Sequence, residues 1–277
     1  MEKVKAFAGK HTFLYCIIVE VLLIAFLLGE GTLIAYLAPE GNYYASFLIQ
    51  EAIGAIVACG LLKMSGLTIV LSNKGSGFWK GLLVGMYLLV VCLLSIVMYL
   101  GIYTGKRQLQ AWYMILIYFA CMICVGVVEE FVFRGIIATL LLKKFTTSRA
   151  GIWKAVVVSG LLFGIAHISN IFGCSPTGVL VQAAIASMLG MLLTAIYFRT
   201  GCIWVTVALH ALVDIAAAIT TGLYGNETMA DTVSSYSPTQ LLSCGIYLIV
   251  LIILLRRSKM DEIELHMNPI LEHSLQD

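Results

Sequence analysis

Long apolar stretches separated by short polar segments dominate the sequence. An α-helix needs about 20 apolar residues to cross the hydrocarbon core of a bilayer. Eight stretches are close to that length or exceed it: 12–37, 44–63, 81–103, 110–142, 151–169, 179–198, 202–220 and 239–255. The stretch 110–142 is too long for one upright helix and must tilt, kink or protrude. We therefore expect an all-α, polytopic membrane helical bundle with about eight transmembrane helices, located in the cell membrane.

Charge is too scarce for a water-soluble surface. Of the 277 residues, 61% are hydrophobic and 12% are charged, whereas about 25% charge is usual for soluble domains. This composition excludes a soluble enzyme and a disordered chain. The formal net charge of +2 is also too small to indicate a nucleic-acid partner. The partner that the composition does predict is the lipid bilayer.

Lysine and arginine predict the orientation, because cytoplasmic loops carry an excess of both residues. If both termini lie inside the cell, the outer loops hold only Lys106 and Arg107, and Arg134 lies within a helix. The other fourteen of the seventeen cations fall in cytoplasmic segments: Lys3, Lys5, Lys10, Lys63, Lys74, Lys80, Lys143, Lys144, Arg149, Lys154, Arg199, Arg256, Arg257 and Lys259. The distribution therefore predicts an N-in, C-in topology.

Ionisable side chains inside the apolar stretches are costly, and each is a candidate for function. Six of them fall between residues 129 and 214: Glu129, Glu130 and Arg134 in the fourth stretch, His167 in the fifth, and His210 and Asp214 in the seventh. Glu130 and Arg134 are four residues apart and share a helix face, while Glu129 points about 100° away. Asp214 is four residues from His210, so we expect it to accept a hydrogen bond from that imidazole and fix its tautomer.

Depth supports a common site. Counted from the cytoplasmic edges of their stretches, Glu129, His167, His210 and Asp214 lie about 10–20 Å deep at 1.5 Å per residue. A lone histidine or a lone Glu–Arg pair is more often structural, but independent structural groups have no reason to match in depth. Four other polar residues in the apolar stretches are isolated in sequence, and we assign them no chemistry: Glu20, Glu30, Glu51 and Gln182.

Such a cluster fits hydrolysis. A buried carboxylate beside an imidazole can act as general base on water, and a second imidazole can stabilise an oxyanion. Zinc is the alternative, with His167, His210 and Glu129 as ligands and an open position for water, although the HExxH helix of zinc proteases is absent. The residues alone leave the choice between these two mechanisms open.

The order EExxxR, FxxxH and HxxxD resembles the CPBP family of intramembrane endopeptidases, which includes the type II CAAX prenyl proteases and the bacteriocin-processing or immunity (Abi) proteins. The residues that match the three motifs are Glu129, Glu130 and Arg134, then Phe163 and His167, then His210 and Asp214. The resemblance covers roughly residues 110–220. The sequence departs from the family at Asp214, where many members have Asn; an ionised Asp has no amide hydrogen to donate.

The resemblance implies an all-helical membrane protease that needs no cofactor and cuts a membrane-associated peptide or protein. It implies that Glu129 and His167 activate water, that His210 and Asp214 assist as catalytic residues, and that a supporting set preserves geometry and charge: Glu130, Arg134 and Phe163. On this basis the chain divides into N-terminal transmembrane helices (1–105), a catalytic helical core (106–222), and an outer loop, last transmembrane helix and cytoplasmic tail (223–277).

Two other functions remain open from the sequence. One is a non-enzymatic membrane immunity or scaffold protein that binds a peptide or partner and uses the polar cluster as a structural network. The other is a proton-coupled transporter, because buried Glu and His also serve proton relays. The sequence shows no internal repeat, which disfavours the transporter.

Overall fold

The computed structural model describes residues 2–37, 43–225 and 228–276, and every regular element within them is a helix. The elements in chain order are α1 (Glu2–Lys10), α2 (Thr12–Leu37), α3 (Tyr43–Met64), α4 (Ile69–Ser72), α5 (Phe78–Val84), α6 (Met86–Tyr103), α7 (Trp112–Glu130), η1 (Phe131–Ala138), α8 (Thr139–Phe145), α9 (Arg149–Ala166), η2 (His167–Phe172), α10 (Pro176–Thr200), α11 (Ile203–Ala217), α12 (Ile219–Tyr224), α13 (Met229–Ser234), η3 (Pro238–Leu241), α14 (Leu242–Leu254), η4 (Arg257–Lys259) and α15 (Met260–Gln276).

The protein is an all-helical, multi-pass integral membrane protein. Among the described residues, five helices are long and apolar enough to cross a membrane: Thr12–Ile34, Tyr43–Met64, Trp112–Phe145, Arg149–Phe172 and Pro176–Thr200. Two further candidates are bent pairs, Phe78–Val84 with Met86–Ile102 (80°) and Pro238–Leu254 with Arg257–Glu272 (62°). The apolar helix α11 has 15 residues and is shorter than a full span. The count of eight transmembrane helices and the N-in, C-in topology stay predictions.

Two segments fold differently from the prediction made from the sequence. The stretch 81–103 is not one straight helix, because α5 and α6 meet at Gly85 with a bend of 80°. A side chain at Gly85 would clash with Leu209, so glycine permits close packing on α11. The second is the segment after α14, which the sequence predicts to be a cytoplasmic tail. It forms α15, in which Ile263 and Met267 are fully buried and Glu262 pairs with Arg199 at 3.0 Å.

The long fourth stretch is continuous from Trp112 to Phe145 but changes its winding in the middle. It passes through the π-helix η1, in which all eight residues are buried. The Thr139 hydroxyl donates a hydrogen bond to the Arg134 carbonyl oxygen five residues earlier, at 2.9 Å. Wide turns of this kind are rare and occur mostly at functional sites. Here the wide turn begins one residue after Glu130 and contains Arg134.

Close packing of α9 on α10 depends on two glycines. A Cβ at Gly160 would clash with Met191, and one at Gly164 would clash with Ser187 and the Ala183 carbonyl oxygen. Small residues four apart let two helix backbones approach closely in membrane proteins. This contact fixes the end of α9, where Phe163 and His167 lie.

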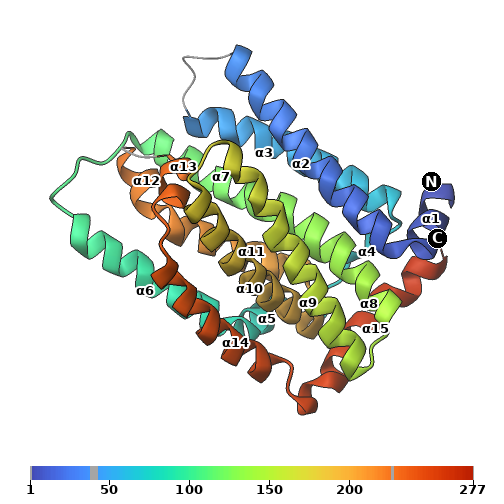
Figure 1. The fold of residues 1–277 in the computed structure, drawn as a ribbon. Helices are drawn as coiled ribbons and strands as arrows, with labels where there is room; N and C mark the ends of the chain where they lie inside the picture. Colours follow the sequence, from blue (N-terminus) through green and yellow to red (C-terminus); the bar gives the residue numbers. More distant parts are fainter. Residues whose placement is uncertain (1, 38–42, 226–227, 277) are drawn as a thin grey trace.

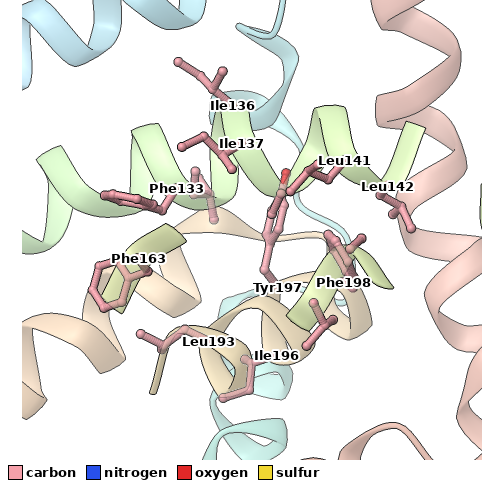
Figure 2. Packing of buried hydrophobic residues seen from close by; sticks show 14 of the residues in the cluster. Phe133, Ile136, Ile137, Leu141, Leu142, Phe163, Leu193, Ile196, Tyr197 and Phe198 are labelled. Carbon is pink, nitrogen blue, oxygen red and sulfur yellow. The ribbon is translucent and has the colours of Figure 1, made fainter. Parts of the chain in front are cut away.

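The hydrophobic core lies between the fourth stretch and α10. Figure 2 shows buried side chains of this cluster: Phe133, Ile136, Ile137, Leu141 and Leu142 from η1 and α8, and Leu193, Ile196, Tyr197 and Phe198 from α10. All of these residues are buried. The dense packing makes the helices around the polar cluster a rigid support.

The two ends of the bundle differ. Figure 1 shows both chain termini, α1 and α15 at one end, and α12 and α13 at the other. We call the first the cationic end, because α1 contains Lys3, Lys5 and Lys10, and Glu262 of α15 pairs with Arg199 and Lys259. We call the second the cavity end, because Met229 and Val233 of α13 line a cavity between the helices.

Candidate active site

A cavity of about 440 Å³ lies between helices near the cavity end. Its volume is in the range of about 300–1,000 Å³ usual for ligand pockets. All four predicted catalytic residues line it: Glu129, His167, His210 and Asp214. The convergence expected from depth is therefore present in the structure. His167, however, directly follows the 18-residue helix α9 and so lies closer to the cavity end than the depth estimate placed it.

His210 is the hub of the polar cluster. Its Nδ1 lies 2.7 Å from Glu130 Oε1, which is a hydrogen bond with the ring N–H as donor when Glu130 is ionised. Its Nε2 faces Glu129 Oε2 at 3.4 Å and Asp214 Oδ2 at 3.7 Å. The expectation that Asp214 orients the imidazole is therefore wrong, because 3.7 Å is too long for a hydrogen bond and Glu130 occupies the orienting position.

Glu130 and Arg134 form a fully buried ion pair behind the cavity wall. Glu130 Oε1 is 2.8 Å from Arg134 Nη1, and neither side chain is exposed. The guanidinium also donates from Nη2 to the Gly190 carbonyl oxygen at 3.3 Å and lies over the Phe163 ring at 4.5 Å. The predicted shared helix face is confirmed. Such a pair holds its geometry because removal of either partner would leave an uncompensated charge.

Phe163 connects the two histidines. Its ring centroid is 4.9 Å from that of His167 and 5.5 Å from that of His210, and both contacts are edge-on. His167 Nδ1 lies 2.8 Å from the Phe163 carbonyl oxygen, which can only accept, so the ring donates Nδ1–H. In the neutral tautomer that this bond selects, His167 Nε2 is an acceptor, and within the described part of the chain it has no hydrogen-bond partner.

Glu129 is the carboxylate left accessible. Its side chain is 23% exposed, against 0% for its neighbour Glu130. Its one close polar contact within the described residues is His210 Nε2. A carboxylate that lines a cavity beside an oriented imidazole can take a proton from a water molecule.

Two polar residues of the cavity were not predicted from the sequence. Glu51 of α3 and Gln182 of α10 were set aside as isolated, yet both line the cavity. Gln182 Oε1 accepts a hydrogen bond from Asn170 Nδ2 at 2.8 Å. Glu51 lies eight residues into its helix, and a depth count applied to α3 was the one signal that could have found it.

The residues do not fit a metal site. Across residues 2–37, 43–225 and 228–276, no three side chains of His, Cys, Asp or Glu are grouped so that they could hold a metal ion. The predicted zinc ligands His167, His210 and Glu129 are therefore not grouped as a metal site in the described part of the chain.

Comparison with known proteins gives one match. Residues 110–216 match the family model described as type II CAAX prenyl endopeptidase Rce1-like. No curated protein and no solved structure matches the chain. The matched range contains the ion pair, Phe163 and all four predicted catalytic residues, whereas α1 to α6 and Glu51 lie outside it. Residues 110–216 of this membrane protein are thus an Rce1-like domain of the type II CAAX prenyl endopeptidase family, consistent with the CPBP family that its motifs resemble.

Proposed function

We propose that the protein is an intramembrane glutamic endopeptidase that hydrolyses a peptide bond of a membrane-associated peptide or protein. The observation that carries the proposal is the position of Glu129: it lines the cavity, and the imidazole of His210 beside it is held by the buried Glu130–Arg134 pair. The Rce1-like match supports protease activity in this part of the chain.

The reaction needs one water molecule. Glu129 takes a proton from the water while the water oxygen attacks the carbonyl carbon of the substrate. His167 Nε2 accepts a hydrogen bond from the same water and so orients it. A tetrahedral oxyanion forms. When His210 is doubly protonated, it donates Nδ1–H to Glu130 and offers Nε2–H to that oxyanion. The C–N bond then breaks, and Glu129 passes its proton to the leaving amine.

Asp214 has a different role in this scheme from an Asn at the same position. An ionised carboxylate cannot donate to the oxyanion. Asp214 instead faces His210 Nε2 at 3.7 Å, so it supplies negative charge that favours the doubly protonated imidazole.

The test is cleavage of a membrane-tethered peptide by the purified protein in liposomes. Glu129→Ala and His167→Ala should each reduce the rate by about 10²–10⁴-fold, the usual contribution of a general base. Glu20→Gln is the matched control, because Glu20 is a buried carboxylate of α2 that does not line the cavity. Full activity in both cavity variants would contradict the proposal. Biological protection retained in Glu129→Gln, at normal expression, would favour the non-enzymatic immunity function.

Chelation distinguishes the two hydrolytic mechanisms. We expect activity to survive chelators and the purified protein to hold no stoichiometric metal by elemental analysis. Loss of activity on chelation, with recovery on addition of Zn²⁺, would establish the zinc-dependent version instead.

We also propose that the cavity opens on the non-cytoplasmic side. Its outer lining comes from the cavity end: Tyr43 at the start of α3, Phe172 and Cys174 after α9, and Met229 of α13. Of these, Phe172 is 83% exposed. The cations gather at the opposite end of the bundle, which the excess of Lys and Arg in cytoplasmic loops makes the cytoplasmic end.

Cys174 provides the test of this orientation, since it is half-buried and lines the cavity. A membrane-impermeant maleimide should label it in intact cells, and Cys174→Ser should remove that label. Labelling of Cys174 that appears only after the cells are opened would place the cavity on the cytoplasmic side.

A further inference from the structure

The cavity has a second polar wall that the hydrolytic scheme does not use. It belongs to α3, outside the range that matches the protease family, and its polar residues are Gln50 and Glu51. Gln50 Nε2 donates to the Leu27 carbonyl oxygen at 2.7 Å, which fixes that amide. Glu51 makes no hydrogen bond and no ion pair within the described residues.

Glu51 is more buried than its lack of partners would predict. Only 5% of the residue is exposed, and an isolated carboxylate removed from water is costly unless something compensates it. Glu130, equally removed from water, has both Arg134 and His210 as partners. Glu51 is therefore buried like a paired carboxylate but has no partner within the described residues. Because its side chain lines the cavity, a bound molecule could supply that partner.

The charges around Glu51 indicate the sign of the missing partner. Glu51 interacts electrostatically with Glu129, Asp214 and Glu30, all of them acidic. No described lysine or arginine lines the cavity, and Arg134 behind the wall is paired with Glu130. Among the described residues, the cavity walls therefore carry three carboxylates, and two histidines are their only basic groups. The cavity repels a free carboxylate and attracts a cation.

We propose that Glu51 forms a specificity subsite for a cationic nitrogen of the substrate, either a Lys or Arg side chain or a free N-terminal amine. The inference rests on the proposed function, because it assigns this wall to the same peptide that Glu129 attacks. The apolar lining next to Glu51 suits the methylene stem of such a side chain; it includes Leu27, Phe47 and Met122.

Binding tests the subsite without turnover. The probes are lipid-anchored, N-acetylated apolar peptides with a photo-cross-linker and one variable position that is Lys, norleucine or Glu; a second set has norleucine there and a free N-terminus. Each is titrated against full-length Glu129→Gln protein in liposomes. We expect Lys peptides to bind at least about tenfold more tightly than norleucine peptides, with Glu peptides weakest. Preference for the free amine alone would assign the subsite to an N-terminus.

Variants at Glu51 decide the result. In the Glu129→Gln background, Glu51→Gln should reduce the preference for the cation to less than about twofold, and Glu51→Lys should reverse it. Glu20→Gln is the matched control and should leave the preference unchanged. If Glu51→Lys does not fold, the isosteric Glu51→Gln carries the test. Equal binding of all probes, or an unchanged preference in Glu51→Gln, would overturn the inference.

The result is separable from the hydrolytic proposal. If the wild-type protein binds Lys probes through Glu51 but cleaves none of them, the endopeptidase function fails and the subsite stands. If it cleaves peptides with no dependence on the variable position, the function stands and the subsite fails.

Discussion

Glu129 and Glu130 are neighbours on one helix, yet they lie in opposite environments. Glu130 faces the packed core, where it is fully buried and contacts both Arg134 and His210. Glu129 faces the cavity and is 23% exposed. The difference of one residue corresponds to about 100° on an α-helix. One helical turn therefore carries both a buried charge that contacts the His210 imidazole and an accessible carboxylate that lines the cavity.

The largest effect on stability should come from breaking the buried pair. Glu130→Gln leaves the Arg134 guanidinium buried without a counter-charge, which costs about 3–5 kcal/mol in the free energy of unfolding. Denaturant unfolding in detergent measures this loss. The cavity residue gives the contrast, since Glu129→Gln should change stability by less than about 0.5 kcal/mol.

A double variant separates the charge from the packing. Glu130→Gln combined with Arg134→Met removes both charges and should recover part of the stability lost in the single variant. A double variant as unstable as the sum of the two single variants would mean that the ion pair itself contributes nothing. Equal destabilisation by Glu129→Gln and Glu130→Gln would contradict the conclusion that Glu130 is a buried, paired charge and Glu129 is not.

A moderate effect is expected from the glycine contact that positions the histidine wall. Gly164→Ala places a methyl group against the Ala183 carbonyl oxygen and Ser187, and overpacking of this kind costs about 1–3 kcal/mol. Because His167 follows on the same helix, peptide cleavage should fall as well. Gly245→Ala serves as the control, since a Cβ at Gly245 of α14 would have no atom within 4 Å and Gly245 does not line the cavity. Full cleavage in Gly164→Ala would show that His167 tolerates displacement.

A smaller effect should follow from loosening the wide turn. Thr139→Val removes the hydrogen bond to the Arg134 carbonyl oxygen at 2.9 Å, which is worth about 1 kcal/mol. Thermal unfolding measures the change, and Thr139→Ser, which keeps the hydroxyl, should restore most of it. The same loss in both variants would assign the effect to the methyl group and not to the hydrogen bond.

The smallest effect concerns α13, which lies at the cavity mouth. Hydrogen bonds from the Thr228 backbone and hydroxyl hold the pKa of Asp231 below its ordinary value of 3.8. A lowered pKa gives stability that is present above 3.8 and is lost as the pH falls through the lowered pKa. Hydrogen exchange, corrected for intrinsic rates, should show α13 loosening only in acid. Asp231→Asn should abolish this pH dependence, and loosening near neutral pH in the wild type would contradict the assignment.

Much of the fold and site is predictable from the sequence because it depends on local spacing. Apolar length identifies the membrane helices, and the interval of four residues pairs Glu130 with Arg134. Contacts between helices are not encoded in this way. The hydrogen bond from His210 to Glu130 joins residues 80 apart, and nothing in the local pattern distinguishes Glu130 from Asp214 as its acceptor.

The remaining misses have similar causes. Glu51 is alone in its stretch, so only the packing of α3 beside α7 places it in the cavity. The close approach of Gly85 to Leu209 joins two helices that are far apart in the sequence. The C-terminal segment has a mostly polar sequence, but its apolar residues Ile263 and Met267 fall on one face of α15 and are buried in the core. Each of these depends on tertiary contacts that periodicity does not encode.

The π-helix sets the rotational phase between the two halves of the fourth stretch. A wide turn takes up about one residue more than an α-turn, and one residue corresponds to about 100° of rotation. The wide turns therefore let Trp112–Glu130 keep Glu129 on the cavity while Thr139–Phe145 independently keeps its apolar side against α9. A single-residue deletion within 131–138 would force the helix to choose between these two partners. The protein would keep either the packing of Thr139–Phe145 on α9 or the position of Glu129 on the cavity, but not both.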